Sequence, residues 1–330
     1  MAETMKMGRR PLLSGLAALA GAAGVASTRA QAANFPTGRV TLVVPFPQGA
    51  STDVTMRVMA DRLTQMWGQP VLVDNKGGAN GIIAAEAVMR AKPDGYTLLA
   101  TSSMTHAGNP SLYDRLSYDP IKDFEPITRM SLVPMVVLVH KGLGVHTLAE
   151  LTAKLKAEPG KHNYGSGAVS SRVVSELYKM LAGVDAVFVG YKNNQLAAPD
   201  LNNGTISFMI IDLSSAKMIL NSGWADALAV SQAVRASGLP EVPSAPEAGL
   251  PGLIFTTWSA FYAPKGTPRD VILQLNKDII AAGNNPETAA KLDAMGGAPS
   301  FTTPEGLADF TASEIVAWRK VIRAANIKVE

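Results

Sequence analysis

Apolar residues follow two different spacings at the start of the mature chain. Residues 39–44 form an unbroken β-branched and apolar run, which is typical of a strand that is covered on both faces. Residues 51–66 place apolar side chains at helical intervals. Between them lies a loop with Pro45, Pro47 and Gly49. We therefore expect a buried strand, a short loop and an amphipathic helix in succession.

The start of this helix is expected to face a ligand. Ser51 or Thr52 can serve as its N-cap, and Asp53 falls in the first turn, where the helix dipole favours a negative charge. A loop that leads from a strand into a helix directs unpaired backbone N–H groups beyond the carboxyl end of the strand. Such a place attracts anions.

Strand-like and helix-like segments then alternate with short connections. Strands are predicted at 71–73 and 96–101, with a helix over 82–91 between them. This βαβαβ run indicates a parallel, doubly wound sheet. The extended stretch 126–139, interrupted by Pro134, is long enough to leave one lobe and enter another.

A second alternating region follows and ends in helices. Its predicted elements are helices at 148–157 and 170–181 and strands at 162–164, 186–191, 206–211 and 225–230. Residues 255–263 are apolar and extended, as a return crossing would be. Helical spacing recurs over 268–282, and Thr303 as N-cap with Pro304 at the first helical position opens a last helix.

These elements predict an α/β protein with two lobes. Residues 33–131 and 258–330 are assigned to lobe 1, and residues 132–257 to lobe 2. Two crossing segments, 128–136 and 256–263, would form a hinge between them.

The first 32 residues are expected to be a cleaved export signal rather than part of the fold. Arg9 and Arg10 precede the apolar run 11–26, and Ala30-Gln31-Ala32 matches a signal-peptidase site. The run is too short for a membrane span. General export to the periplasm is predicted; twin-arginine export and an uncleaved anchor are the alternatives.

Charge and cysteine content exclude several classes of protein. Four of the 30 basic and one of the 27 acidic residues lie in the signal, so the mature chain has 26 of each and is close to neutral. Nucleic acid is therefore not an expected partner. The chain has no cysteine, which excludes disulfides and thiolate metal sites.

The sequence offers little catalytic chemistry. None of the four histidines has the spacing of a metal pair, and Tyr164-Gly165-Ser166-Gly167 lacks the leading Gly of a nucleophile elbow. We expect no enzymatic activity, no cofactor and no metal. The remaining enzymatic alternative is a periplasmic hydrolase that uses Ser166 or Ser170 with a histidine.

Several segments resemble the extracytoplasmic substrate-binding proteins of tripartite tricarboxylate transporters, also called the Bug family. They include RVTLVVPFPQGASTD, THAGNPSLYDRLSYDPIKDFEPIT, KHNYGSG and PSAPEAGLPG. The resemblance implies the type II periplasmic-binding-protein fold, with two Rossmann-like lobes, a ligand cleft between them and two crossing segments. It also implies a small carboxylate ligand that is delivered to a membrane permease, and no enzymatic activity. A ligand-sensing subunit for a membrane kinase is the alternative, and a monomer is expected.

The chain departs from the family pattern at the expected cleft. Ala50 stands where the family usually has Gly, Arg172 where His is common, and Asn193-Asn194 where Gly usually follows Tyr191-Lys192. The fold assignment does not depend on these positions, whereas the identity of the ligand does.

The candidate ligand is a small organic acid with two carboxylates, bound one to one without a metal. Three helices are expected to start on the cleft side, near Thr52, Gly81 and Ser170. The family resemblance implies that backbone N–H groups of the first two of these loops hold one carboxylate. Arg172 offers a two-donor fork for the other, unless it points to solvent. Asp212 is expected to be a helix cap, an inter-lobe hydrogen-bond acceptor or a ligand contact. The sequence does not choose among C4 to C6 dicarboxylates, tricarboxylates and aromatic diacids. The full set of candidate ligand-binding residues is Phe46, Gln48, Gly49, Ala50, Ser51, Thr52, Asp53, Asn80, Ser102, Ser103, His106, Ser166, Gly167, Ser170, Arg172, Tyr191 and Asp212.

Overall fold

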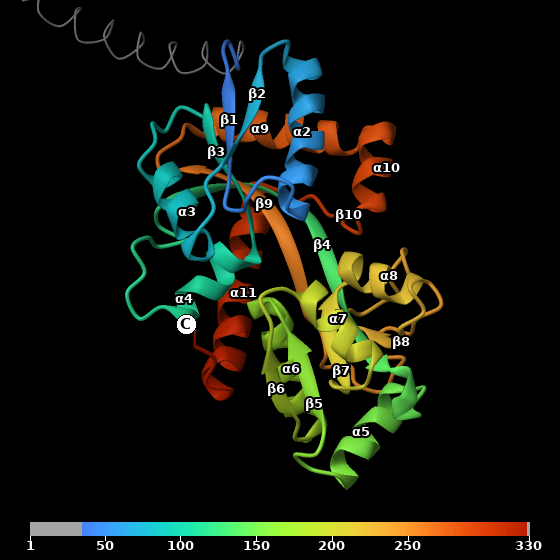
Figure 1. The fold of residues 1–330 in the computed structure, drawn as a ribbon. Coiled ribbons are helices and arrows are strands. Elements are labelled where there is room, and N and C mark those ends of the chain that lie inside the picture. Colours follow the sequence, from blue (N-terminus) through green and yellow to red (C-terminus); the bar gives the residue numbers. More distant parts are fainter. Residues whose placement is uncertain (1–34, 329–330) are drawn as a thin grey trace, which may run out of the picture.

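The computed structural model describes residues 35–328, which form one curled mixed sheet flanked by helices (Figure 1). The strand order is β2-β1-β3-β9-β4-β7-β5-β6, and β8 and β10 both pair with β4. The predicted signal, residues 1–32, lies outside the described residues. The α/β fold predicted from the sequence is confirmed.

The first end of the sheet is the predicted parallel βαβαβ unit. β1 (Val40–Val44) lies between β2 (Val71–Asn75) and β3 (Thr97–Ser102) and is parallel to both. The connections contain α2 (Ser51–Trp67) and α3 (Ile82–Met89), the second preceded by a short 3-10 turn.

β1 is covered on both faces, as its sequence predicts. Val40, Leu42 and Val44 pack into a hydrophobic cluster with α2, whereas Val43 belongs to the cluster on the opposite face. All four are buried. This burial explains why the strand reads as a continuous apolar run rather than an alternating one.

Two long antiparallel strands join the two ends of the sheet. β4 (Phe124–His140) pairs with β9 (Thr256–Pro264) as far as the Pro134–Thr256 pair. From Met135 onward, β4 pairs with β7 instead. The predicted crossing stretches, 126–139 and 255–263, are therefore strands that lie side by side.

The second end of the sheet is built on the other half of β4. Its strands are β5 (Asn163–Ser166), β6 (Val187–Gly190), β7 (Phe208–Asp212) and β8 (Ala225–Val230). β5 is parallel to β6 and β7, whereas β7 and β8 are antiparallel to β4.

Four helices of the second end connect these strands, and two of them were missed. α5 (Leu148–Ala157) and α6 (Val169–Ala182) match the predicted segments. The sequence did not predict α7 (Asn194–Asn202) or α8 (Leu213–Asn221). Both helices are short, and α7 contains Pro199, a residue whose local preference is for a loop rather than a helix interior.

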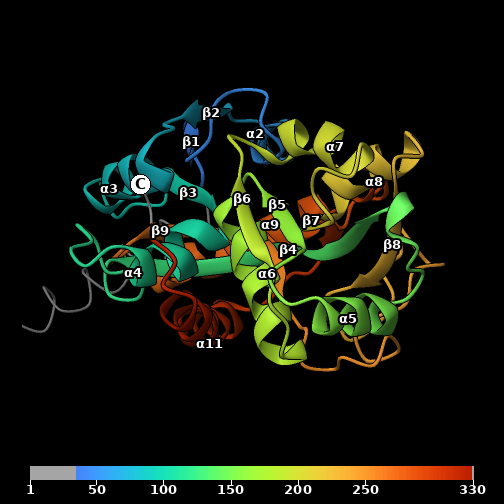
Figure 2. The ribbon, with the colours of Figure 1, turned by 60° about the horizontal axis from the view of Figure 1, so that its bottom comes forward.

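The C-terminal helices return to the first end of the sheet. α9 (Arg269–Gly283) and α11 (Pro304–Ala324) were predicted, the latter with the observed N-cap, but α10 (Pro286–Ala294) and the short β10 (Ala298–Pro299) were not. α11 lies along β4 and also contacts α6, so it packs against both ends of the sheet (Figure 2).

Short helical turns follow two of the strands. After β3, residues 104–112 form a π-helical turn (Met104–Gly108) and α4 (Asn109–Leu112), and a 3-10 turn (Lys141–Leu143) follows β4.

Candidate ligand-binding cleft

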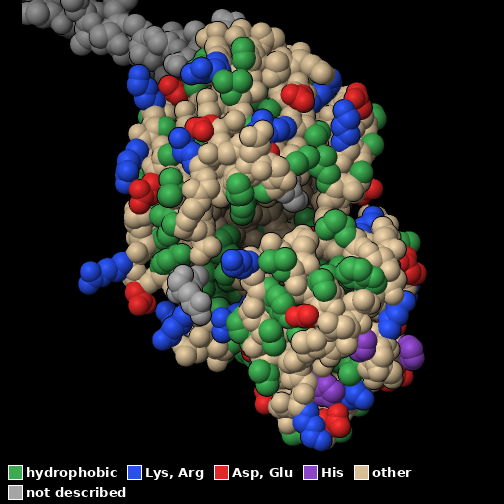
Figure 3. Space-filling model, in the orientation of Figure 1, with side chains coloured by type: hydrophobic (Ala, Val, Ile, Leu, Met, Phe, Trp, Pro, Cys, Tyr) green, Lys and Arg blue, Asp and Glu red, His purple; other side chains and the backbone are tan. Residues whose placement is uncertain are grey.

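A hollow opens between the two ends of the sheet (Figure 3) and contains two cavities. The Met-lined cavity has a volume of about 270 Å³ and reaches Met56, Met130, Met218 and Met295. The loop-lined cavity has a volume of about 630 Å³. Both are lined by Thr52, Ser102, Asp212 and Thr257, so they are adjoining parts of one cleft.

The loop-lined cavity is surrounded by turns that follow strands or precede helices. From the first end of the sheet come the loop after β1, the turn at 78–81 and residues 102–104. The second end contributes Asp212 and the start of α6, where Ser170 lies. The predicted residues on this cavity are Phe46, Thr52, Asn80, Ser102, Ser103, Ser170 and Asp212.

The start of α2 differs from the sequence prediction in its cap. The N-cap is Ala50, and no side chain caps the helix, so the prediction of Ser51 or Thr52 as N-cap is wrong. Ser51 is already the first helical residue, because the extended backbone that an N-cap requires occurs one position earlier. No N-cap side chain therefore accepts from the first N–H groups of α2.

Asp53 holds the loop before α2 rather than lining the cavities. It is 1% exposed and accepts hydrogen bonds from Gly49 N at 2.8 Å, Arg57 Nε at 3.1 Å and Asn75 Nδ2 at 2.9 Å. Burial alone would raise the pKa of this carboxyl, but the hydrogen bonds from Arg57, Gly49 and Asn75 together leave it lowered. The neighbouring Gln48, Gly49 and Ala50 belong to the same loop and do not line either cavity.

α6 likewise begins without a side-chain cap. Its N-cap is Ala168, which makes no capping bond. Ser166 Oγ donates to the Ala168 carbonyl at 2.8 Å, and Gly167 N donates to Asn194 Oδ1 at 2.9 Å. A Cβ on Gly167 would lie 2.0 Å from a backbone atom of Asn193, so this loop is packed against the start of α7. Ser166 and Gly167 thus fix the loop that presents the start of α6.

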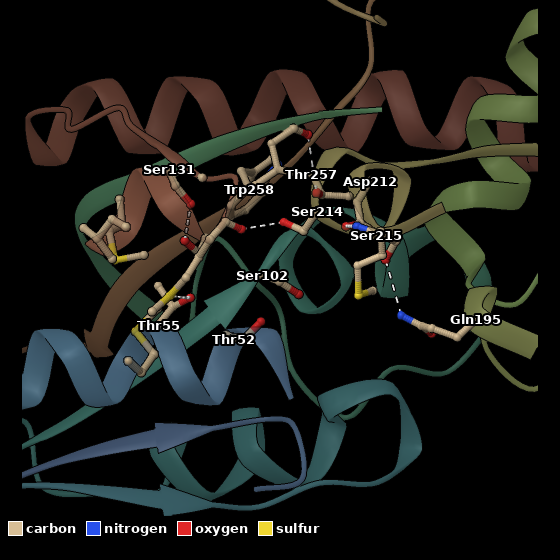
Figure 4. Close-up of a pocket in the computed structure, with 18 residues that line it drawn as sticks. Thr52, Thr55, Ser102, Ser131, Gln195, Asp212, Ser214, Ser215, Thr257 and Trp258 are labelled. Atoms are coloured by element: carbon tan, nitrogen blue, oxygen red, sulfur yellow. Dashed lines mark hydrogen bonds between the residues drawn. The ribbon is translucent and has the colours of Figure 1, made fainter. Parts of the chain in front are cut away.

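α8 contributes an edge of the cleft that the sequence analysis did not anticipate. Asp212 is its N-cap and accepts from Ser215 N at 2.9 Å, which confirms the helix-cap interpretation. Ser214 and Ser215 line the Met-lined cavity opposite Thr52 and Thr55 of α2 (Figure 4). An Asp directly before an apolar-spaced segment is a helix-start signal, so Asp212 could have revealed this helix.

Residues of the crossing strands form the floor of the Met-lined cavity and were also missed. Ser131 of β4 and Ser259 of β9 share a hydrogen bond of 2.7 Å. Trp258, which precedes Ser259 on β9 and also lines this cavity, donates through Nε1 to Glu314 Oε2 at 3.0 Å. The remaining lining residues that were not predicted are Thr55, Met56, Met130, Val133, Gln195, Ser214, Ser215, Met218, Thr257, Leu292, Met295 and Gly297.

Three predicted residues point elsewhere. His106 is 0% exposed, its ring stacks on that of Tyr262 at 3.9 Å, and burial lowers its pKa to about 3. The Arg172 guanidinium lies 4.2 Å from the ring centroid of Phe188. Tyr191 donates to Asp200 Oδ2 at 2.6 Å, and burial together with that carboxylate raises its pKa to about 12. None of the three lines either cavity.

The described lining of the cleft consists of hydroxyl, amide and apolar side chains with one carboxylate, that of Asp212. No Lys, Arg or His is among the described residues that line it, and the serines of its lining have no histidine beside them. Residues 35–328 contain no cluster of three or more His, Asp or Glu side chains that could hold a metal ion. Within the same residues, no helix is long and apolar enough to span a membrane.

A cleft between the two ends of the sheet, with helix starts around it, is the arrangement expected of a solute-binding protein. The family assignment agrees. Residues 55–327 match the family described as tripartite tricarboxylate transporter family receptor. The chain belongs to this family, whose members are binding receptors rather than enzymes.

Individual relatives match over nearly their whole length. Protein BugT of Bordetella pertussis is 33% identical over 311 residues, which cover 93% of this chain and 95% of BugT. The structure of R. palustris Rpa4515 with adipate has 34% identity and a TM-score of 0.77, covering 89% of this chain and 99% of that one. The structure of MatC from Rhodopseudomonas palustris with bound malate has 30% identity and a TM-score of 0.71, covering 87% of this chain and 100% of MatC.

Proposed function

We propose that this chain captures a small organic di- or tricarboxylate, aliphatic or aromatic, in the periplasm and delivers it to the membrane permease of a tripartite tricarboxylate transporter. The observation that carries the proposal is the pair of helix starts at the loop-lined cavity. α2 and α6 come from different ends of the sheet, and neither has a side-chain cap. Their free N–H groups are suited to one carboxylate, with a gain of about 0.3–1 kcal/mol per helix and up to about 2 when partly buried.

The relatives support an acidic ligand. The two R. palustris structures contain adipate and malate, both of which are dicarboxylic acids. The Met-lined cavity gives room for the carbon chain of such an acid, because methionine side chains adapt to irregular apolar shapes. The absence of basic side chains from the described lining leaves backbone N–H and hydroxyl groups as the donors to a carboxylate.

Closure of the cleft would follow from bending of the two crossing strands. We assign the described part of residues 33–131, with 258–328, to one lobe and residues 132–257 to the other. β4 changes partner from β9 to β7 between Pro134 and Met135, and register shifts occur between Pro126 and Thr128 and between Arg129 and Ser131. Such irregularities are places where a strand bends readily.

Two further parts of the proposal concern the whole protein. Residues 1–32 direct its export, and it functions as a monomer.

A thermal-shift screen of small di- and tricarboxylates, each beside its monocarboxylate analogue, tests the ligand class. A ligand present at about 100 times its Kd should stabilise the protein by about 2.7 kcal/mol. Equal shifts with monocarboxylates or neutral solutes would contradict the two-carboxylate proposal. Small-angle scattering then tests closure, since the radius of gyration should fall at saturating ligand and should not change if the lobes are rigidly joined.

A further inference from the structure

Asp212 is the one charged residue among the described residues that line the two cavities. It ends β7, caps α8 and is shared by both cavities, so a ligand that extends from one cavity into the other passes beside it. A carboxylate is an unusual group in a cleft that binds anions, because it repels a second negative charge.

Only part of the hydrogen-bonding capacity of Asp212 is used. Oδ1 accepts from Ser215 N at 2.9 Å. Among the side chains that the structure describes, none donates a hydrogen bond or forms an ion pair with Oδ2. A carboxylate accepts about four hydrogen bonds, and once a ligand displaces water from the cleft, an acceptor without a donor is costly. The ligand itself is then the remaining source of a donor.

We propose that Asp212 is a specificity-determining residue that accepts a hydrogen bond from a hydroxyl or amino group on the ligand. The inference rests on the proposed function, because a carboxylate at the starts of α2 and α6 directs the adjoining carbons past Asp212. An acid with a hydroxyl or amino group beside its carboxylate supplies the missing donor. An unsubstituted diacid offers only C–H groups there, and Asp212 then repels its second carboxylate.

The capping role of Asp212 can be separated from this selective role. Asn serves as an N-cap about as well as Asp does, so Asp212→Asn keeps the bond to Ser215 N while it removes the charge. Asp212→Ser is a second variant that keeps a cap but withdraws the side chain from the cleft. Melting temperatures without ligand check that both variants fold.

The test uses two series of acids that differ at one carbon. The four-carbon series is succinate, L-malate and L-aspartate; the six-carbon series is adipate, 2-hydroxyadipate and 2-aminoadipate. Calorimetry on the wild type should show at least one hydroxy or amino acid bound about tenfold or more tighter than its unsubstituted partner. The two substituted arms distinguish a hydroxyl from an ammonium donor. In Asp212→Asn and Asp212→Ser the unsubstituted acids should bind more tightly than in the wild type, and the preference should fall below about threefold.

Two results would overturn the inference alone. One is wild-type binding of succinate or adipate within about threefold of every substituted partner, and the other is an undiminished preference in both folded variants. Binding of none of the six acids, nor of any other carboxylate in the thermal-shift screen, would overturn the proposed function and this inference with it.

Discussion

Ser214 at the start of α8 donates a hydrogen bond through Oγ to the backbone carbonyl of Met295, which follows α10. Ser214 belongs to the second end of the sheet and Met295 to the first, so this bond joins the two ends beside the Met-lined cavity (Figure 4). Gly296 makes the approach possible, because its φ is +83° and a Cβ there would lie 2.4 Å from Ser214 Oγ. The Ser214–Met295 bond therefore helps to hold the cleft in its present form.

Removing this bond should weaken ligand binding. Ser214→Ala loses one hydrogen bond between the two ends of the sheet, worth about 1 kcal/mol, so the Kd for the ligand should rise about fivefold. Isothermal titration calorimetry measures the change. Ser222→Ala is the matched control, since Ser222 is exposed at the other end of α8 and donates only to Met218 O. An unchanged Kd in Ser214→Ala would show that the bond does not contribute to the bound form.

A negative charge at the start of α6 should act oppositely on stability and on binding. Ser170→Asp places a carboxylate in the first turn, where the helix dipole stabilises it by about 0.5 kcal/mol. The same charge occupies the position proposed for the ligand carboxylate, so affinity should fall more than about tenfold. Ser170→Asn is the control of equal size without the charge. Undiminished carboxylate binding in Ser170→Asp would place the ligand elsewhere in the cleft.

Arg172 should matter for stability and little for affinity. Its guanidinium lies over the Phe188 ring, and such a contact contributes about 1 kcal/mol. We expect Arg172→Ala to lower the free energy of unfolding by about that amount and to change ligand affinity by less than about twofold. A double-mutant cycle with Phe188→Leu isolates the contact in urea denaturation. A large loss of affinity would instead restore Arg172 as a direct ligand contact.

His106 should make the protein less stable as the pH falls. Burial lowers its pKa from 6.5 to about 3 in the folded chain. Below pH 6.5 the unfolded chain therefore binds a proton that the folded chain does not, and stability is lost by about 1.4 kcal/mol per pH unit until the pH approaches 3.

His106→Phe removes this titration while keeping an aromatic ring beside Tyr262. Thr105, which bonds His106 Nδ1 at 2.9 Å, keeps its contacts with Thr101 and the Ser102 carbonyl. Urea denaturation at pH 7.5, 6.0 and 5.0 should show a shallower fall of stability in this variant than in the wild type. An equal fall of stability with pH in the variant and the wild type would mean that folding does not lower the pKa of His106.

Local features of the sequence determined the elements that depend on neighbouring residues. The unbroken apolar run of β1 predicted burial on both faces, and Thr303 with Pro304 predicted the start of α11. The loops after β1 and before α6 were correctly expected to lie at helix starts. Backbone preference and hydrophobic spacing act over a few residues, so the sequence reveals them directly.

Only the tertiary structure decided how the cleft is lined. Ser131 and Ser259 are 128 residues apart, and they meet because β4 and β9 pair in a particular register. Arg172 lies on the Phe188 ring of a neighbouring strand rather than in the cleft, and α8 brings Ser214 to Met295 across 81 residues. These relationships depend on strand register and on packing between distant segments, which no local pattern in the chain specifies.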